Sequence, residues 1–223
     1  MTATLTLDGK IATITMDDGK ANAVNETLID SLHAVLDEAE AKADAVILTG
    51  REGKFSAGFD LGVLGSGDAE TATRLVNRGG GIALRLFTFP LPVIAACNGH
   101  GIAMGCFMLL SSDVRIGVDG PYKIGANETQ IGMVLPTFAL ELTKARLKQE
   151  KLTEAVIQGT LYDPKGAAEV GFLDEVVSVE ELMPRAQAEA ERLGALPGHA
   201  YKGNKLILRQ PFVDVIEPTV IAQ

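Results

Sequence analysis

Short apolar runs recur along this chain, and most of them are followed by a segment with helical periodicity. The run AVILTG at residues 45–50 and the run PVIAAC at residues 92–97 have the length and the side chains of buried strands. Apolar residues spaced three and four apart predict helices over residues 26–41, with Asn25 as the N-cap, and over residues 69–87. Because strand, loop and helix follow one another repeatedly, we predict an α/β fold.

Shorter segments complete the predicted order of elements. Residues 5–7 and 11–16 are predicted to form an N-terminal hairpin, and residues 51–68 a loop. Three successive glycines at residues 79–81 predict an interruption of the second helix. Further strands are expected at 114–118 and 176–177, and further helices at 140–146, 152–158 and 179–193, before a polar tail.

The composition changes near Lys148. Glycine-rich loops and strands precede this residue, and the chain after it is mostly helical and more charged. We therefore expect a core that carries the functional site at residues 1–165, and a helical C-terminal region at residues 166–223.

Charge and cysteine content narrow the classes of partner. The formal net charge of −9 argues against a nucleic acid or an anionic membrane as the main partner. The two cysteines, Cys97 and Cys106, form neither a disulfide framework nor a metal-ligand spacing. The opening stretch MTATLTLDGK lacks a leader pattern, and no apolar run has the length of a membrane span. We expect a cytoplasmic protein without a metal.

A glycine-rich stretch, NGHGIAMGC at residues 98–106, joins a predicted strand to a short predicted helix. Gly99, Gly101 and Gly105 fit a dinucleotide-binding loop, but the stretch lies in mid-chain and the helix is short for a crossover. A structural interpretation is that the glycines relieve crowding where the strand turns into the helix. A third interpretation is an oxyanion site, because the first amides of a helix lack an intrahelical partner.

The oxyanion interpretation requires two backbone donors. The amide of Met104, at the start of the predicted helix, is the first candidate. The loop FSAGFDL at residues 55–61 offers the second, because it also leaves a buried strand and turns at a glycine. Two such donors aimed at one oxygen stabilise the negative charge that develops there during a reaction.

Together these stretches resemble the signatures of the enoyl-CoA hydratase/isomerase, or crotonase, superfamily. FSAGFDL resembles the first signature, and PVIAACNGHGIAMGCFMLLSSDVRI at residues 92–116 resembles the second. The block AAEVGFLDEVV at residues 167–177 is also similar, and the resemblance extends from the hairpin to about Arg209. It implies a spiral of ββα units, C-terminal helices that form a homotrimer or a dimer of trimers, and an acyl-CoA thioester as substrate. It implies no cofactor beyond the coenzyme A of that substrate.

The resemblance also implies catalytic roles. The oxyanion hole of the family maps to the amides of Ala57 and Met104, and Met104 stands where glycine is common. Hydratases of the family use two glutamates. The first maps to Phe107, which cannot transfer a proton, and the second maps to Glu128. The run NETQIG at residues 127–132 is similar to that of Δ3,Δ2-enoyl-CoA isomerases, which use a single glutamate.

The same resemblance implies that Ser56, Asp60, Leu61, Gly105 and Phe107 bind the substrate. Asp60 is expected to order its loop rather than to react. Ser56 lacks the G-x-S-x-G context of a nucleophile. Phe107 is expected in the core or in the lining of an acyl pocket.

The expected reaction moves a double bond from C3 to C2 of an enoyl-CoA, with Glu128 transferring the proton and the two amides holding the enolate oxygen. Three alternatives stay open. They are an enoyl-CoA hydratase of fatty acid oxidation, an acyl-CoA hydrolase, and a protein that binds acyl-CoA without turnover. The short segment after Arg209 predicts an acyl pocket that is either more open or completed by a neighbouring subunit.

Overall fold

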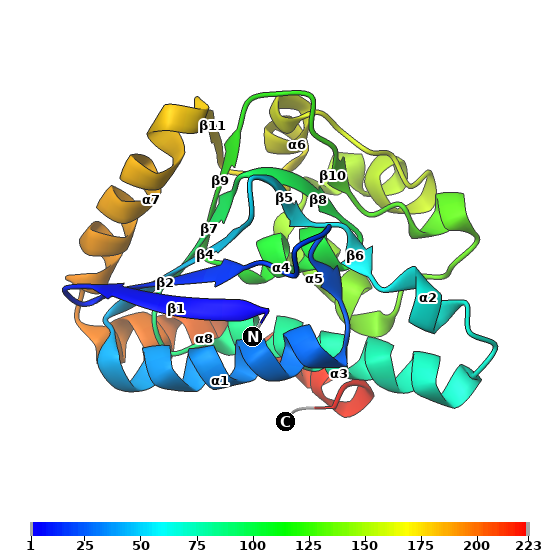
Figure 1. Ribbon diagram of the computed structural model, residues 1–223, viewed down its shortest axis with the longest axis horizontal. Coiled ribbons are helices and arrows are strands. Elements are labelled where there is room, and N and C mark those ends of the chain that lie inside the picture. Colours follow the sequence, from blue (N-terminus) through cyan, green and yellow to red (C-terminus); the bar gives the residue numbers. More distant parts are fainter. Residues whose placement is uncertain (1, 222–223) are drawn as a thin grey trace.

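The computed structural model describes residues 2–221, whose strands form one large and two small sheets (Figure 1). The six-stranded sheet has the order β1-β2-β4-β7-β9-β11, and the small sheets have the orders β10-β8-β5 and β3-β6. β1 and β2 form the predicted antiparallel hairpin, and the later neighbours in the large sheet are parallel. The strands are β1 (Ala3–Asp8), β2 (Ile11–Met16), β3 (Ala23–Val24), β4 (Ala45–Gly50), β5 (Gly53–Ser56), β6 (Gly58–Phe59), β7 (Val93–Cys97), β8 (Gly99–Ile102), β9 (Val114–Val118), β10 (Ile124–Gly125) and β11 (Glu175–Val177).

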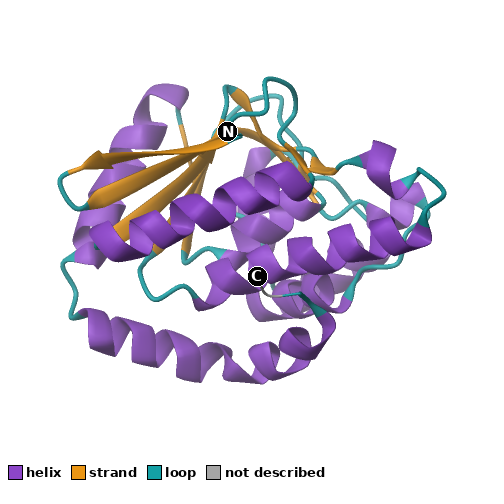
Figure 2. Cartoon of the chain, turned by 60° about the horizontal axis from the view of Figure 1, so that its bottom comes forward, coloured by secondary structure: helices purple, strands orange, loops and turns teal. Residues whose placement is uncertain are grey.

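Helices cover both faces of the large sheet, which Figure 2 shows in orange. On β4, Val46 and Leu48 face the main core, whereas Ala45 and Ile47 face a second core under α7. This alternation is that of a strand buried on both faces. The helices are α1 (Glu26–Lys42), α2 (Leu61–Leu64), α3 (Ala69–Thr88), α4 (Met104–Ser111), α5 (Thr137–Arg146), α6 (Pro164–Val170), α7 (Val179–Gly194) and α8 (Gly198–Ile216).

One supersecondary unit repeats along the chain. A strand of the large sheet is followed by a strand of a small sheet and then by a helix, as in β7-β8-α4; in β4-β5-α3 the short β6 and α2 precede the helix, and in β9-β10-α5 a 3-10 turn does. This arrangement confirms the predicted spiral of ββα units. It also argues against the dinucleotide interpretation, because β8 separates β7 from α4 and belongs to a different sheet.

Two predictions about the middle of the chain were wrong. The predicted loop at residues 51–68 contains β5, β6 and α2, and α3 continues through the three glycines at residues 79–81. Gly80 lies against neighbours that leave no room for a side chain. A Cβ built on it would lie 2.5 Å from Val220 Cγ1 and 2.7 Å from Phe138 Cδ1. The glycines therefore allow close packing, and that packing holds the helix.

The predicted polar tail was also wrong, because residues 198–216 form α8. The buried face of this helix includes Lys205 and Arg209, whereas Ile207 and Leu208 are 77% and 76% exposed. This reverses the usual amphipathic pattern, which is why periodicity did not reveal the helix. The boundary at residue 165 stays a prediction, and β11 beyond it pairs with β9 in the large sheet.

Candidate active site

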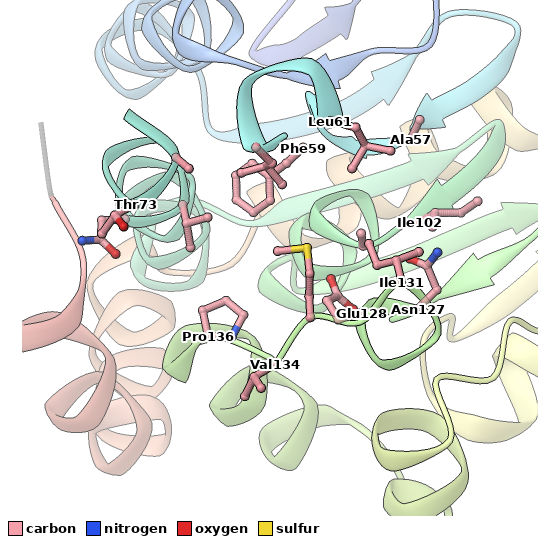
Figure 3. A pocket seen from close by; sticks show the side chains of 16 residues that line it. Ala57, Phe59, Leu61, Thr73, Ile102, Asn127, Glu128, Ile131, Val134 and Pro136 are labelled. Atoms are coloured by element: carbon pink, nitrogen blue, oxygen red, sulfur yellow. The ribbon is translucent and has the colours of Figure 1, made fainter. Parts of the chain in front are cut away.

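A cavity of about 420 Å³ lies where β6, β8, α3 and the turn after β10 meet (Figure 3). Ala57, Ile102, Asn127 and Glu128 lie at one end of it, and Thr73 of α3 lies at the other. The volume falls within the range of small-molecule sites. Most of the lining is apolar, namely Ala57, Phe59, Leu61, Leu64, Ala72, Val76, Ile102, Ala103, Ile131, Met133, Val134 and Pro136.

Glu128 begins a short 3-10 turn, Glu128–Ile131, directly after β10. Met133 N donates to the Glu128 carbonyl at 2.8 Å and closes this turn. The Glu128 residue is only 4% exposed, and its Oε2 accepts no hydrogen bond from any described residue. Burial raises the pKa of its carboxyl to about 7. Among the described residues that line the cavity, Glu128 is the only acidic one, and it can exchange a proton near neutral pH.

The start of α4 supplies backbone amides beside this cavity. The first intrahelical bond runs from Phe107 N to Ala103 O, so the amide of Met104 has no partner within the helix. Ala103 precedes the helix with φ 50° and ψ −121°, a conformation that costs a non-glycine residue about 1–3 kcal/mol. This strained residue directs the start of α4 toward β6.

Gly58 of β6 lies against the start of α4. A Cβ built on Gly58 would lie 2.8 Å from Ala103 Cβ and 3.5 Å from Met104 N. Gly58 has a φ of 96°, so both its conformation and its surroundings require glycine. The two loops that sequence analysis paired therefore meet at the cavity.

The structure corrects one of the two predicted oxyanion donors. Ala57 lines the cavity as expected, but its amide donates to Ala21 O at 3.0 Å and is therefore engaged within the protein. Phe59 also lines the cavity and pairs with Val24 of β3, through a bond from Asp60 N to Val24 O at 3.0 Å. In such a parallel pair the intervening amide points away from the partner strand. The amide of Phe59 thus points away from β3.

The predicted substrate-binding residues divide into one that lines the cavity and four that do not. Leu61 lines it and is 64% exposed. Asp60 caps α2 by accepting from Gly62 N at 2.9 Å, so it orders the loop as expected. Ser56 is buried, and its Oγ donates to Asn22 O at 2.7 Å. Both side chains thus hydrogen-bond to backbone groups of the protein itself.

Gly105 and Phe107 are packing residues of α4. A Cβ on Gly105 would lie 2.5 Å from Ser56 O, so this glycine permits contact between α4 and β5. The Phe107 ring is fully buried and packs edge-to-face on Phe138, with centroids 5.7 Å apart. Phe107 is therefore a core residue, which is the first of the two places expected for it.

Sequence analysis did not single out Asn127 or Phe59. Asn127 lines the cavity next to Glu128, and its Oδ1 is buried without a hydrogen-bond partner among the described residues. Its position in the same short run as Glu128 was the available signal. For Phe59 the signal was its place directly after Gly58, where the backbone turns.

Residues 2–221 contain neither a metal-binding cluster nor a membrane-spanning helix. Within this part of the chain, no three His, Cys, Asp or Glu side chains are grouped so that they could hold a metal ion. In the same residues, no helix combines the length and the apolar character needed to cross a membrane.

Comparison with known proteins identifies relatives. The family described as enoyl-CoA hydratase/isomerase matches residues 6–222. The mitochondrial enoyl-CoA delta isomerase 1 of Homo sapiens is 35% identical over 170 residues, which are 74% of this chain and 55% of that protein. The chain thus spans little more than half the length of this relative. A probable enoyl-CoA hydratase of Mycobacterium avium is 32% identical over 203 residues, which are 89% of this chain and 77% of that protein.

A solved structure agrees with these matches. An enoyl-CoA hydratase/isomerase family protein from Pseudomonas syringae superposes with a TM-score of 0.95 at 42% identity, covering 98% of this chain and 94% of that one. The family match spans nearly the whole sequence, and the fold agrees over nearly the same length. The chain therefore belongs to the enoyl-CoA hydratase/isomerase family.

Proposed function

We propose that the protein is an enoyl-CoA isomerase that converts a 3-enoyl-CoA into a 2-enoyl-CoA. The observation that carries this proposal is Glu128, a buried carboxyl group in the lining of an apolar cavity, whose Oε2 accepts no hydrogen bond from the described residues. The apolar lining suits an acyl chain. The relative named enoyl-CoA delta isomerase 1 supports the same reaction.

The oxyanion hole of this proposal consists of the amides of Phe59 and Met104. Both stand beside Gly58, where β6 approaches the start of α4. Loss of one such donor typically raises a reaction barrier by about 3–4 kcal/mol. Phe59 replaces the predicted Ala57, whose amide donates to Ala21.

The reaction needs one group that first accepts and then donates a proton. The Glu128 carboxylate removes a proton from C2, and the electron pair of the broken C–H bond moves onto the thioester oxygen as an enolate. The amides of Phe59 and Met104 stabilise that charge. Protonated Glu128 then delivers its proton to C4, which restores the thioester carbonyl and forms the double bond between C2 and C3. A pKa near 7 suits both steps at neutral pH.

Product analysis with three substrates tests the proposal. The protein is expected to convert 3-hexenoyl-CoA into 2-hexenoyl-CoA faster than it hydrates crotonyl-CoA, and to leave a saturated acyl-CoA intact. Glu128→Gln is expected to lower isomerisation by about 10²–10⁴-fold while acyl-CoA binding persists. Faster hydrolysis of the saturated ester would indicate a hydrolase. Tight binding without any product would indicate a binding protein.

We also propose self-association through α8, in line with the expected homotrimer. Ile207 and Leu208 expose most of their apolar surface, and Val215 on the same helix is 45% exposed. Leu208→Lys is expected to lower the mass measured by light scattering, whereas Lys202→Glu on the same helix is the control. An unchanged mass for Leu208→Lys would contradict this surface. A cytoplasmic location stays a prediction.

A further inference from the structure

The polar side chains that line the active-site cavity form two pairs. Asn127 and Glu128 lie at the Ala57 end of the cavity, and Thr73 lies at the other end (Figure 3). Asn77 also lines the cavity and follows Thr73 by four residues on α3. Residues four apart lie one above the other on the same face of a helix, so Thr73 and Asn77 form the second pair. The rest of the described lining is apolar.

Both residues of the second pair are accessible to a ligand. Thr73 is exposed and Asn77 is half-buried. The backbone carbonyl of Asn77 accepts from Ile221 N at 3.1 Å, so this contact with the C-terminal segment does not use the side-chain amide. A neighbouring hollow, lined also by Glu70 and Arg74, shares Thr73 and Asn77 with the cavity. The cavity therefore ends at a polar pair on this side.

The chemistry of this pair suits an uncharged oxygen group. The hydroxyl of Thr73 and the carboxamide of Asn77 can each donate and accept hydrogen bonds. A hydroxyl group of a ligand also does both, so it can bond to either side chain. The nearest charges have opposite signs, because Glu70 and Arg74 both line the neighbouring hollow. Arg74 is also paired with Glu26 at 3.3 Å. These surroundings do not favour a ligand group of either charge.

Gly79 of α3 indicates how long a chain must be to reach this pair. A Cβ built on Gly79 would lie 2.4 Å from Phe59 Cε1 and 3.7 Å from Met104 Sδ, so Gly79 lies beside the oxyanion residues. Thr73 precedes Gly79 by six residues of the helix, which span about 9 Å. An extended chain advances about 1.2 Å per bond, so about eight bonds separate the thioester carbon from a group at Thr73.

We propose that the cavity selects an enoyl-CoA of about eight carbons with a hydroxyl group at the end of its acyl chain, and that Thr73 and Asn77 bind this hydroxyl. The inference rests on the proposed function, because it uses the same cavity and the same bound thioester. It adds a substrate class to that function. A plain hydrocarbon chain fits the apolar lining but leaves the two polar side chains without a ligand partner.

The test compares the binding of two saturated thioesters, so it does not depend on turnover. Isothermal titration calorimetry gives Kd for octanoyl-CoA and for 8-hydroxyoctanoyl-CoA. The wild-type protein is expected to bind the hydroxylated ester more tightly. Thr73→Val and Asn77→Leu are each expected to weaken its binding by about 2- to 10-fold, the effect of one lost hydrogen bond, and to retain octanoyl-CoA binding. Thr73→Ser keeps a hydroxyl and is expected to keep the wild-type ratio of the two constants.

Thr88→Val is the matched control, because it makes the same substitution on α3 at a residue outside the cavity lining. Thr88 Oγ1 donates to Leu84 O at 2.8 Å. This variant is expected to leave the ratio of the two dissociation constants unchanged. The inference would be overturned by tighter wild-type binding of octanoyl-CoA, by an unchanged ratio in both Thr73→Val and Asn77→Leu, or by an equal shift in Thr88→Val.

Kinetics distinguish this inference from the proposed function. With 8-hydroxy-3-octenoyl-CoA, Thr73→Val is expected to raise KM and to leave kcat nearly unchanged, because the distant hydroxyl is bound equally in the ground state and the transition state. A lower kcat at unchanged KM would contradict this role of Thr73. A wild-type protein that prefers the hydroxylated ester, loses the preference in the variants, and yet does not isomerise would overturn the proposed function and leave the hydroxyl site standing.

Discussion

Asp113 and Glu128 both have buried acidic side chains, and the surroundings of the two carboxyl groups differ in kind. Asp113, between α4 and β9, accepts from Lys205 Nζ at 2.6 Å and forms an ion pair with Arg209 Nη2 at 2.8 Å. It also accepts from Val93 N at 2.8 Å. Glu128 has no cation beside it in the lining of its cavity, and its Oε2 accepts no bond from the described residues.

The cations around Asp113 also bind the end of a helix. Lys205 Nζ donates to the carbonyls of Phe89 and Leu91, and Arg209 donates to that of Phe87. Carbonyls at a helix C-terminus lack intrahelical partners and attract positive charge. The Asp113 cluster therefore fixes α8 against the end of α3.

Cavity size alone does not separate the two regions. A second cavity of about 390 Å³ is lined by Asp113, Tyr201, Lys205 and Arg209, and it is almost as large as the one at Glu128. The two acids differ in whether the protein itself supplies ionic and hydrogen-bond partners for the carboxylate. The acid that the fold pairs completely serves structure, whereas the acid that the fold leaves unpaired in an apolar cavity is free to exchange a proton.

Asp113→Asn is expected to give the largest change in stability. It leaves Lys205 and Arg209 buried without an anion, which should lower the free energy of unfolding by about 3–5 kcal/mol. Denaturant unfolding monitored by circular dichroism measures this change. Glu38→Gln is the control, because it breaks the exposed pair of Glu38 with Lys42 and should cost less than about 1 kcal/mol. A similar loss of unfolding free energy in both variants would show that the buried ion pairs of Asp113 stabilise the fold no more than an exposed pair does.

Glu128→Gln is expected to change stability in the opposite direction. The folded pKa of about 7 lies above the ordinary value of 4.5, so the native state binds more protons than the unfolded state between these pH values. Ionised Glu128 therefore destabilises the wild-type protein increasingly as pH rises from 4.5 to 7. At pH 8 the variant should be more stable by about 3 kcal/mol, with little gain near pH 4. A variant less stable than wild type at pH 8 would contradict the unpaired state of this acid.

The same carboxyl predicts the pH dependence of catalysis. Glu128 must be ionised to accept a proton, so kcat/KM for 3-hexenoyl-CoA should rise about tenfold per pH unit below pH 7 and level off above it. Initial rates between pH 5 and 9 measure the profile. A midpoint near 4.5 would mean that burial does not perturb the acid when substrate enters.

The sequence predicted those elements whose own residues determine them. The apolar run Ala45–Gly50 has the length and side chains of an interior strand that is buried on both faces, and the structure has β4 at those residues. Asn25 caps α1 by accepting from Leu28 N, as its residue type and position predicted. The apposition of residues 55–61 and 98–106 was predicted because each stretch leaves a buried strand and turns at a glycine, and the family resemblance pointed to the same pair.

The predictions that were wrong concern segments whose structure depends on contacts with residues distant in sequence. The helix at residues 198–216 buries Lys205 and Arg209 because Asp113, which lies far away in sequence, supplies the counter-charge. The donor predicted at Ala57 was wrong because Ala21 accepts from its amide. A single sequence shows neither partner, since both come from segments that only the fold brings near.

The smallest expected effect concerns the strain at Ala103, which belongs to the Glu128 region. Its φ of 50° suits glycine, so Ala103→Gly should raise the free energy of unfolding by about 1 kcal/mol. The same substitution at Ala34, an exposed position inside α1, should instead lower it by about 1 kcal/mol. Thermal unfolding of both variants measures the difference in sign.

Ala103→Gly should also separate stability from activity. Ala103 sets the direction of the Met104 amide, and a more flexible residue there should lower kcat for isomerisation with little change in KM, because the amide acts mainly on the enolate. A protein that gained stability and kept its full kcat would show that this strain does not orient the oxyanion donor. In that case only the unpaired Glu128 carboxyl would distinguish the cavity from the Asp113 cluster, because it alone would lower stability and serve catalysis.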